Sequence, residues 1–343
     1  MVSARRFGPV VLLCLLAAAN VPAGGEELPV SSHFNLVKLA DGVAAAIAVP
    51  GGTAVSNAGI VDLGGEMLVF DATFSLASAA DLARAAQTIG TGPVRWLVNS
   101  HHHADHVWGN QAFPASTRVV SSAAARTALL SSPPECTEAG MKEATTRLTQ
   151  LETLLAKAPE GREKRELANS VGYARGFLET CPTLALRPAE ATFSETFMIH
   201  GTRRRAELRA VGHGLTPGDV ILYLPDDGVV FSGDLILLGM HPYMSETTAA
   251  DWRAGLAELA RLKVNKVVPG HGDVGDATVI AVMQRYLDEV EAAARRAASG
   301  LDPAAEAKRA AVPAEFESWL YPGIFRINVS HVLDELRARR PSP

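Results

Sequence analysis

Four of the ten histidines in this 343-residue chain lie within six positions, and an aspartate stands among them. The group consists of His101, His102, His103, Asp105 and His106. Imidazole and carboxylate groups are ligands that Zn²⁺ commonly takes in proteins. Successive side chains of an extended backbone point to opposite sides, so His101 and His103 should face one point and His102 the other side. The pattern predicts a metal site in which His102 is a neighbour rather than a ligand.

A buried strand is expected to position this group. The apolar run Val94–Val98 ends just before the histidines and is typical of a strand covered on both faces. A strand end is rigid, and the loop after it lets several side chains turn toward one point. Asp105 and His106 follow where the chain turns, so they can serve a second metal ion beside the first.

The motif His101-x-His103-x-Asp105-His106 resembles the metal motif of the metallo-β-lactamase-fold hydrolases. Three later stretches continue the match in order, namely Gly-His-Gly-Leu-Thr-Pro-Gly-Asp at 212–219, Phe-Ser-Gly-Asp at 231–234 and Val-Pro-Gly-His-Gly at 268–272. The resemblance covers about residues 34–276. Within the superfamily, the chain is most similar to periplasmic zinc hydrolases associated with quinoprotein relay or sulfur oxidation.

The resemblance implies a centre for two metal ions. It assigns His101 and His103 to a first site, Asp105, His106 and His271 to a second, and Asp234 to a bridge between the ions. Asp105 is also the candidate catalytic residue. By analogy with the family, Asp71 supports the site through hydrogen bonds and does not bind metal. A buried aspartate after the apolar strand Val229–Phe231 also needs a cationic partner, which suits Asp234.

Two metal ions would lower the pKa of a water molecule held between them and would polarise a carbonyl oxygen. The expected function is therefore an exported zinc-dependent hydrolase that uses metal-activated hydroxide on the carbonyl of an ester, thioester, lactone or lactam. Its partner would be a small-molecule carbonyl substrate. His241 and Tyr243 follow the Asp234 segment and are candidate substrate contacts at the mouth, with a surface role as the alternative for His241.

One position departs from the family pattern. The family has histidine directly before the Thr-x-Gly of the middle motif, where this chain has Leu215, and leucine cannot bind zinc. His213 lies two residues earlier, about 6.6 Å away in an extended segment, and its glycine neighbours permit a bend. Two hypotheses stay open: His213 replaces the missing ligand, or the first site is weak or absent. One or two zinc ions per chain are expected.

The same residues bear on four alternative functions. A β-lactamase is an alternative, although Asp234 stands where those enzymes generally have cysteine or serine. An iron-dependent sulfur dioxygenase would need the histidine that Leu215 replaces, and a flavo-diiron protein would have glutamate in place of His103. A non-catalytic zinc-binding protein with a degraded first site is the alternative from a different class.

The first 23 residues are expected to be a signal peptide, with basic Arg5 and Arg6, an apolar stretch 7–19 and small residues before position 24. An uncleaved anchor is the alternative. Cleavage changes the net charge from −5 to −7, because it removes two arginines and no acid. No basic patch suited to nucleic acid is visible. A periplasmic or secreted protein without stable membrane insertion is expected.

Cys136 and Cys181 remain after cleavage, and Cys14 lies within the expected signal peptide. Two helix-like stretches separate them, about 138–157 and 163–178, with the turn Ala158–Gly161 between. A helical hairpin would bring its two ends together. The cysteines therefore form one disulfide or stay as two separate buried thiols, and an oxidising compartment favours the disulfide.

The predicted fold class is α/β, a four-layer αββα metallo-β-lactamase-like sandwich with a helical insertion and a helical C-terminal extension. The expected divisions are a signal peptide at 1–23, a hydrolase domain at 24–276 with the hairpin insertion at 132–182, and the extension at 277–343. Strands are expected at 34–39, 43–49, 58–63, 67–70, 94–98, 208–211, 220–224, 229–232 and 266–268. Further helices are expected at 77–89, 250–262, 277–298, 303–311 and 328–340.

Overall fold

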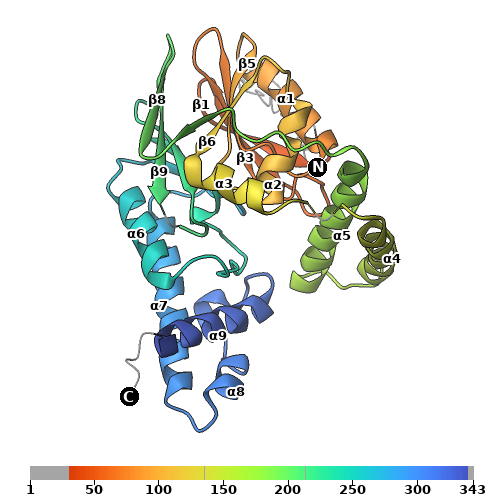
Figure 1. Cartoon of the computed structure of the whole chain (residues 1–343), viewed down its shortest axis with the longest axis vertical. Helices are drawn as coiled ribbons and strands as arrows, with labels where there is room; N and C mark the ends of the chain where they lie inside the picture. The colour runs from red at the N-terminus through yellow and green to blue at the C-terminus, as the bar shows by residue number, and fades with distance from the viewer. Residues whose placement is uncertain (1–30, 135, 213, 339–343) are drawn as a thin grey trace, which may run out of the picture.

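The computed structural model describes residues 31–134, 136–212 and 214–338. The expected signal peptide and His213 lie outside these residues. In the described part, two β-sheets pack against each other and helices cover their outer faces (Figure 1). This arrangement confirms the predicted αββα sandwich. No helix in the described ranges has the length and apolar character needed to cross a bilayer.

The first sheet has seven strands in chain order. Its first four strands are antiparallel neighbours, and β4 to β7 are parallel. Gly64 and Gly65 have φ values of +91° and +89°, so the tight turn between β3 and β4 favours glycine. The strands are β1 (Phe34–Ala40), β2 (Val43–Ala48), β3 (Ala58–Asp62), β4 (Met67–Phe70), β5 (Val94–Val98), β6 (Arg118–Ser122) and β7 (Ala191–Phe193).

The second sheet has five strands in the order β12-β11-β10-β9-β8. All its neighbours are antiparallel except β11 and β12, which run parallel and therefore end at the same edge. Apolar side chains of both sheets form one buried cluster between them, and Phe70 and Phe231 meet there with ring centroids 6.0 Å apart. The strands are β8 (Thr196–His200), β9 (Arg205–Gly212), β10 (Asp219–Leu224), β11 (Val229–Phe231) and β12 (Lys266–Val268).

Helices cover the outer faces because each presents one apolar side. Helix α1 begins with a capping box at Ser75 and buries Ala79, Leu82 and Ala86 against the first sheet. Helices α6 and α7 bury Trp252 and Met283 against the second sheet. The bounds are α1 (Leu76–Ile89), α2 (Ala104–Val107), α3 (Ala123–Ser131), α6 (Ala249–Ala260), α7 (Thr278–Ala298), α8 (Pro303–Lys308) and α9 (Pro322–Ala338).

Several boundaries differ from those predicted. The last helix begins at Pro322 rather than 328, because proline fits the first position of a helix, where its missing N–H costs nothing. The short strands β6, β7 and β8 were not predicted. Four 3₁₀ segments connect larger elements, namely η1 (Trp108–Ala112), η2 (Cys181–Thr183), η3 (Gly233–Leu235) and η4 (Ala314–Phe316).

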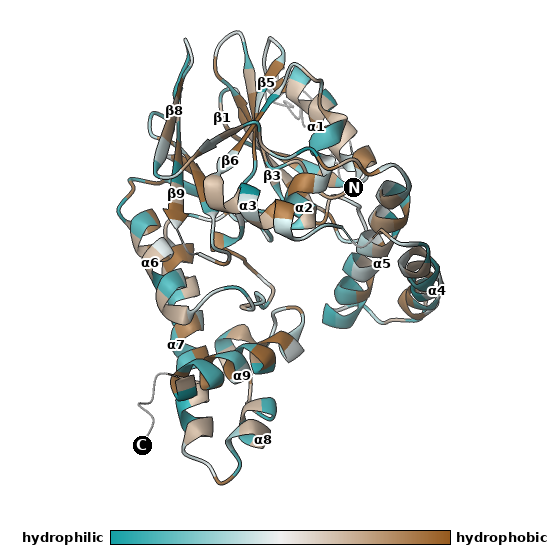
Figure 2. Ribbon diagram, in the orientation of Figure 1, coloured by the Kyte–Doolittle hydropathy of each residue, from teal (hydrophilic) through white to brown (hydrophobic). Residues whose placement is uncertain are grey.

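Helices α4 (Glu138–Leu155) and α5 (Arg162–Thr180) form the expected hairpin, which projects from one side of the sandwich (Figure 1). Figure 2 shows hydrophilic residues along much of α5 and hydrophobic residues in many strands of the two sheets. The insertion has its own small apolar contact, where Leu151 of α4 packs with Val171 and Ala174 of α5. This contact joins the two helices of the hairpin.

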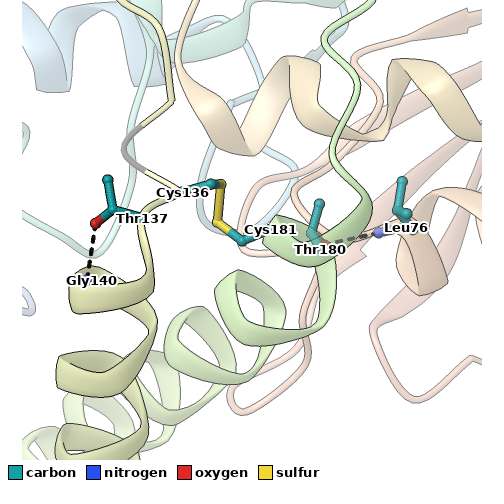
Figure 3. Close-up of a disulfide and its surroundings, with 6 residues drawn as sticks. All are labelled: Leu76, Cys136, Thr137, Gly140, Thr180 and Cys181. Carbon is teal, nitrogen blue, oxygen red and sulfur yellow. Dashed lines mark hydrogen bonds between the residues drawn. A yellow bond between two sulfur atoms is a disulfide. The ribbon is translucent and has the colours of Figure 1, made fainter.

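A disulfide closes the base of this hairpin. Cys136 and Cys181 are bonded, with their Cα atoms 5.2 Å apart, and Figure 3 shows them between the start of α4 and the end of α5. Thr180 Oγ1 accepts a hydrogen bond from the backbone N–H of Leu76 at 3.3 Å, which ties this end to α1. The predicted disulfide is confirmed, and the hypothesis of separate thiols is wrong.

Replacement of both cysteines by serine should destabilise the hairpin. The bond spans 45 residues, and for a loop of that length the chain-entropy model gives about 4 kcal/mol. Urea unfolding of the double variant, beside the wild-type protein with and without reductant, measures the loss. Equal stability of the variant and the oxidised wild type would contradict this role of the bond.

Candidate metal centre

The candidate site lies where strands of both sheets end. Asp71 follows β4 and His101 follows β5, which run parallel and end at the same edge of the first sheet. Asp234 and His271 follow β11 and β12 at the corresponding edge of the second sheet. The two edges meet, so side chains far apart in sequence come together there.

Four donor atoms form a tight group, called here the four-donor centre: Asp105 Oδ2, His106 Nε2, Asp234 Oδ1 and His271 Nε2. The four distances between a carboxylate oxygen and an imidazole nitrogen in this group run from 3.3 to 3.6 Å. A tetrahedral zinc ion with ligands at roughly 2.0–2.1 Å needs ligand atoms about 3.3 Å apart. The four atoms therefore lie close to the positions that one such ion requires.

The burial of these atoms supports the same fit. His106 Nε2 and Asp234 Oδ1 are buried, and neither has a hydrogen-bond partner in the described part of the chain. A buried polar atom without a partner is costly, and a metal ion would satisfy both. Nitrogen and carboxylate donors in a tetrahedral arrangement suit Zn²⁺. The residues present therefore fit a divalent ion.

The pKa shifts of His271 and Asp234 also fit a cation in the four-donor centre. Burial lowers the pKa of His271, but the carboxylates of Asp234 and Asp105 outweigh it and raise that pKa to about 10. Burial raises the pKa of Asp234, but His271 and His106 hold it well below its usual range. The carboxylates thus stay ionised and need positive charge beside them, which protons or a metal ion can supply.

Neighbouring residues fix the orientation of the ligands. Asp71 Oδ2 lies 2.8 Å from His106 Nδ1, and its other oxygen accepts the backbone N–H of Ser100 at 2.7 Å. This leaves His106 Nε2 facing the centre, in the manner of a carboxylate that orients a metal-binding histidine. Asp71 takes the supporting role that the resemblance implied.

The loop that carries His271 is held just as firmly. Asn57 Nδ2 donates to the carbonyls of Pro269 and Gly272, on either side of the histidine, at 2.9 and 2.8 Å. A Cβ atom added at Gly270 would lie 1.9 Å from Asp234 Oδ1. Only glycine at position 270 lets the loop approach the Asp234 carboxylate this closely.

Leu215, which offers no metal-binding atom, stands at the third position of the first site expected from the family pattern. His101 Nε2 is buried, lies 3.9 Å from Asp234 Oδ2 and has no hydrogen-bond partner among the described residues. His103 turns to Glu246, with Nε2 3.0 Å from Oε1. Leu215 is 3 % exposed and packs in the apolar core, while its backbone N–H donates to Asp219 at 2.6 Å. Substitution by His213 stays a hypothesis, because that residue lies outside the described ranges.

A cavity of about 890 Å³ opens beside the four-donor centre, and His271 forms part of its wall. Tyr173 of α5 lies in the wall and stacks on Phe74, with ring centroids 4.6 Å apart. The remaining wall comes from the end of β2, from the hairpin, from residues 238–240 and from the segment before α9. The insertion and the C-terminal extension thus enclose the space in front of the four-donor centre.

The two candidate substrate contacts lie elsewhere. His241 is fully buried among Tyr286, Trp319 and Phe325, so the expectation that it lines the mouth or lies on the surface needs correction. Its neighbours come from α7 and the C-terminal extension, which local sequence could not place beside it. Tyr243 is 52 % exposed and is not part of the cavity wall. Glu246 and Tyr173 were not among the predicted site residues, because no local motif marks them.

Comparison with known proteins agrees with this geometry. The family described as Metallo-beta-lactamase superfamily matches residues 51–271. A search of curated proteins gave no significant match. The chain belongs to the metallo-β-lactamase superfamily, whose members include metal-dependent hydrolases, as the resemblance implied.

Solved structures with the same fold are distant in sequence. A metallo-β-lactamase from Pontibacter korlensis has a TM-score of 0.53 and 16 % identity over 75 % of this chain and 99 % of that one. DIM-1 metallo-β-lactamase exposed to ceftazidime has a TM-score of 0.51 and 17 % identity over 77 % and 99 %. FIM-1 from Pseudomonas aeruginosa, in its mono-zinc form, has a TM-score of 0.52 and 15 % identity over 77 % and 98 %. These likenesses show the fold.

Removal of the Asp71 carboxylate charge should weaken metal binding. Asp71→Asn would lose the acceptor that orients His106, and changes of this kind typically cost about 10–100-fold in metal affinity. Competition with a chromophoric chelator measures the affinity. Asp226→Asn, on an exposed turn, is the matched control and should leave it unchanged. An Asp71→Asn variant with wild-type affinity would contradict the supporting role.

The buried His241 should make the fold sensitive to acid. Burial lowers its pKa from 6.5 to about 4, so between these values the unfolded chain binds a proton that the folded chain does not. The free energy of unfolding should therefore fall as the pH drops from about 6.5 to about 4, by at most about 3 kcal/mol from this group.

His241→Phe should flatten this pH dependence, because phenylalanine suits the aromatic cluster and cannot take up a proton. Urea unfolding at a series of pH values measures the slope, with His200→Asn, at an exposed position of β8, as the control. An unchanged slope in His241→Phe would contradict the assignment.

Proposed function

We propose that this protein is an exported zinc-dependent hydrolase that acts on the carbonyl of an ester, thioester, lactone or lactam. The observation that carries the proposal is the four-donor centre, in which each carboxylate oxygen lies 3.3–3.6 Å from each imidazole nitrogen, at the wall of a cavity of about 890 Å³. The cavity has the size of a typical small-molecule site. The residues that would hold the ion are Asp105, His106, Asp234 and His271.

A divalent ion bound there would supply Lewis acidity, which promotes ionisation of water near neutral pH and polarises a carbonyl oxygen. Residues of the chain orient the water and the ligands. Asp105 presents Oδ2 to the centre, which leaves its other oxygen to orient an attacking water or to accept its proton. Asp71 keeps His106 aligned, and the packed sheet edges keep the ligands fixed.

The cavity wall suits a small substrate with both apolar and polar parts. Tyr173 and Phe177 offer aromatic surface, and the charged residues Glu143, Arg147 and Arg165 stand on the hairpin side. The hairpin is joined to the C-terminal extension by two hydrogen bonds, from Arg162 to the carbonyl of Glu317 and from the backbone of Tyr321 to Glu166. Substrate would bind between these two elements and reach the centre at His271.

Export is supported by two independent features. The first 23 residues have the composition of a signal peptide, and the disulfide is of the kind that persists in an oxidising compartment. Zinc is supported by the donor types, and FIM-1, a protein of the same fold, is known in a mono-zinc form. Placement beside the quinoprotein-relay and sulfur-oxidation hydrolases remains part of the proposal.

A β-lactamase is the second candidate. Three solved proteins with this fold are metallo-β-lactamases, which favours a lactam substrate. Asp234 contributes its carboxylate to the four-donor centre, where the resemblance would place cysteine or serine in a β-lactamase. A panel that contains both lactams and esters separates the two candidates.

Zinc-loaded protein should hydrolyse at least one member of a panel of ester, thioester, lactone and lactam substrates. Asp105→Asn should lower kcat/KM by about 10²–10⁴-fold, because it removes a ligand and the candidate proton acceptor together. The control Glu195→Gln changes an exposed turn residue and should keep full activity. A zinc-loaded protein that accelerates none of these reactions would favour the non-catalytic alternative.

A further inference from the structure

A second group of metal-binding side chains lies beside the four-donor centre. His102, His103 and Glu246 place one donor atom each within 4.8 Å of the others. Glu246 Oε1 is 3.0 Å from His103 Nε2, and Glu246 Oε2 is 3.3 Å from His102 Nε2. The two imidazole centroids are 4.9 Å apart. A single carboxylate thus faces two adjacent histidines.

We propose that His102, His103 and Glu246 form a second divalent-metal site, which shares His103 with the first site of the family pattern but has different other ligands. The oxygen–nitrogen distances of 3.0 and 3.3 Å match the roughly 3.3 Å between ligands of a tetrahedral zinc ion. The donor set of two imidazoles and one carboxylate is one that Zn²⁺ takes, with a fourth position left to water.

The identity of residue 215 explains why the site lies here. In the family pattern His103 shares its ion with a histidine at the position of Leu215, but Leu215 is buried in the apolar core and offers no donor. His103 instead turns to Glu246, which lies just before the Thr248 cap of α6. Glu246 would replace the missing ligand, and His102 would become a ligand rather than a neighbour.

This position predicts a weaker and more accessible site. The side chains of His103 and Glu246 are 35 % and 36 % exposed, whereas those of His106 and Asp234 are buried. The second site has three protein ligands, and the four-donor centre has four. The structure therefore assigns two classes of binding, a tight one at the four-donor centre and a weaker one at Glu246.

Binding at the second site would also fix a loop. Glu246 belongs to the segment between η3 and α6, and the histidines belong to the segment between β5 and α2, so an ion would hold the two segments together. Hydrogen exchange of the backbone near Glu246 should slow when the weaker class fills. This readout does not depend on catalysis.

Titration of metal-free, full-length protein with Zn²⁺ and with Co²⁺ tests the proposal. Calorimetry and elemental analysis after gel filtration should give two equivalents per chain, one tight and one weaker. Glu246→Gln and His102→Ala should each lose the weaker equivalent and keep the tight one. The control Glu258→Gln changes a partly exposed glutamate on α6 and should keep both metal equivalents. Circular dichroism checks that every variant is folded.

Three outcomes would overturn the proposal. Wild-type protein that binds a single equivalent has no second site, and the proposed hydrolase would still stand on its tight ion. A weaker equivalent retained by both Glu246→Gln and His102→Ala would show a hydrogen-bonded cluster only, with the second ion bound elsewhere. A weaker equivalent lost in His103→Ala alone would place it at the family's first site. Loss of the tight equivalent in His106→Ala tests the proposed function separately.

Discussion

Two carboxylates facing two imidazoles, with His106 and Asp234 buried, are the interaction on which the rest of the site depends. Asp105 and His106 come from the end of the first sheet, and Asp234 and His271 come from the second. Each sheet thus provides one acid and one histidine. A cation among them would join the two sheets at this edge, so we infer that metal binding contributes to stability as well as to chemistry.

The surrounding structure serves to hold these groups and to shield them. Asp71 and Asn57 tie the ligand loops to the first sheet, and Gly270 allows the close approach of the His271 loop to Asp234. The disulfide-closed hairpin and the C-terminal extension then enclose a cavity in front of the centre. Variation in such appended elements changes which substrate fits while the centre stays the same.

The sequence signals for the four-donor centre are local. The ligands follow short apolar strands in compact motifs, and the departure at Leu215 is visible in one position. The αββα class, the helical hairpin and the disulfide also followed from local patterns. Strands β6, β7 and β8 were missed because they are only three to five residues long and mix polar with apolar residues.

The features that the sequence did not predict depend on contacts between residues far apart in the chain. Glu246 is a lone acidic residue 143 positions from His103, so no motif links the two. The sequence neighbours of His241 do not reveal its surroundings, because its aromatic contacts come from Tyr286 of α7 and from Trp319 in the C-terminal segment. Pairings of this kind follow from tertiary packing and cannot be derived from periodicity or spacing.

Anomalous diffraction at the zinc edge, from crystals grown with zinc, would locate the ion. We expect the strongest peak among Asp105, His106, Asp234 and His271, with bonds of about 2.0–2.2 Å to the four donor atoms. A strongest peak bonded to none of these atoms, or no peak there with zinc in excess, would contradict this expectation.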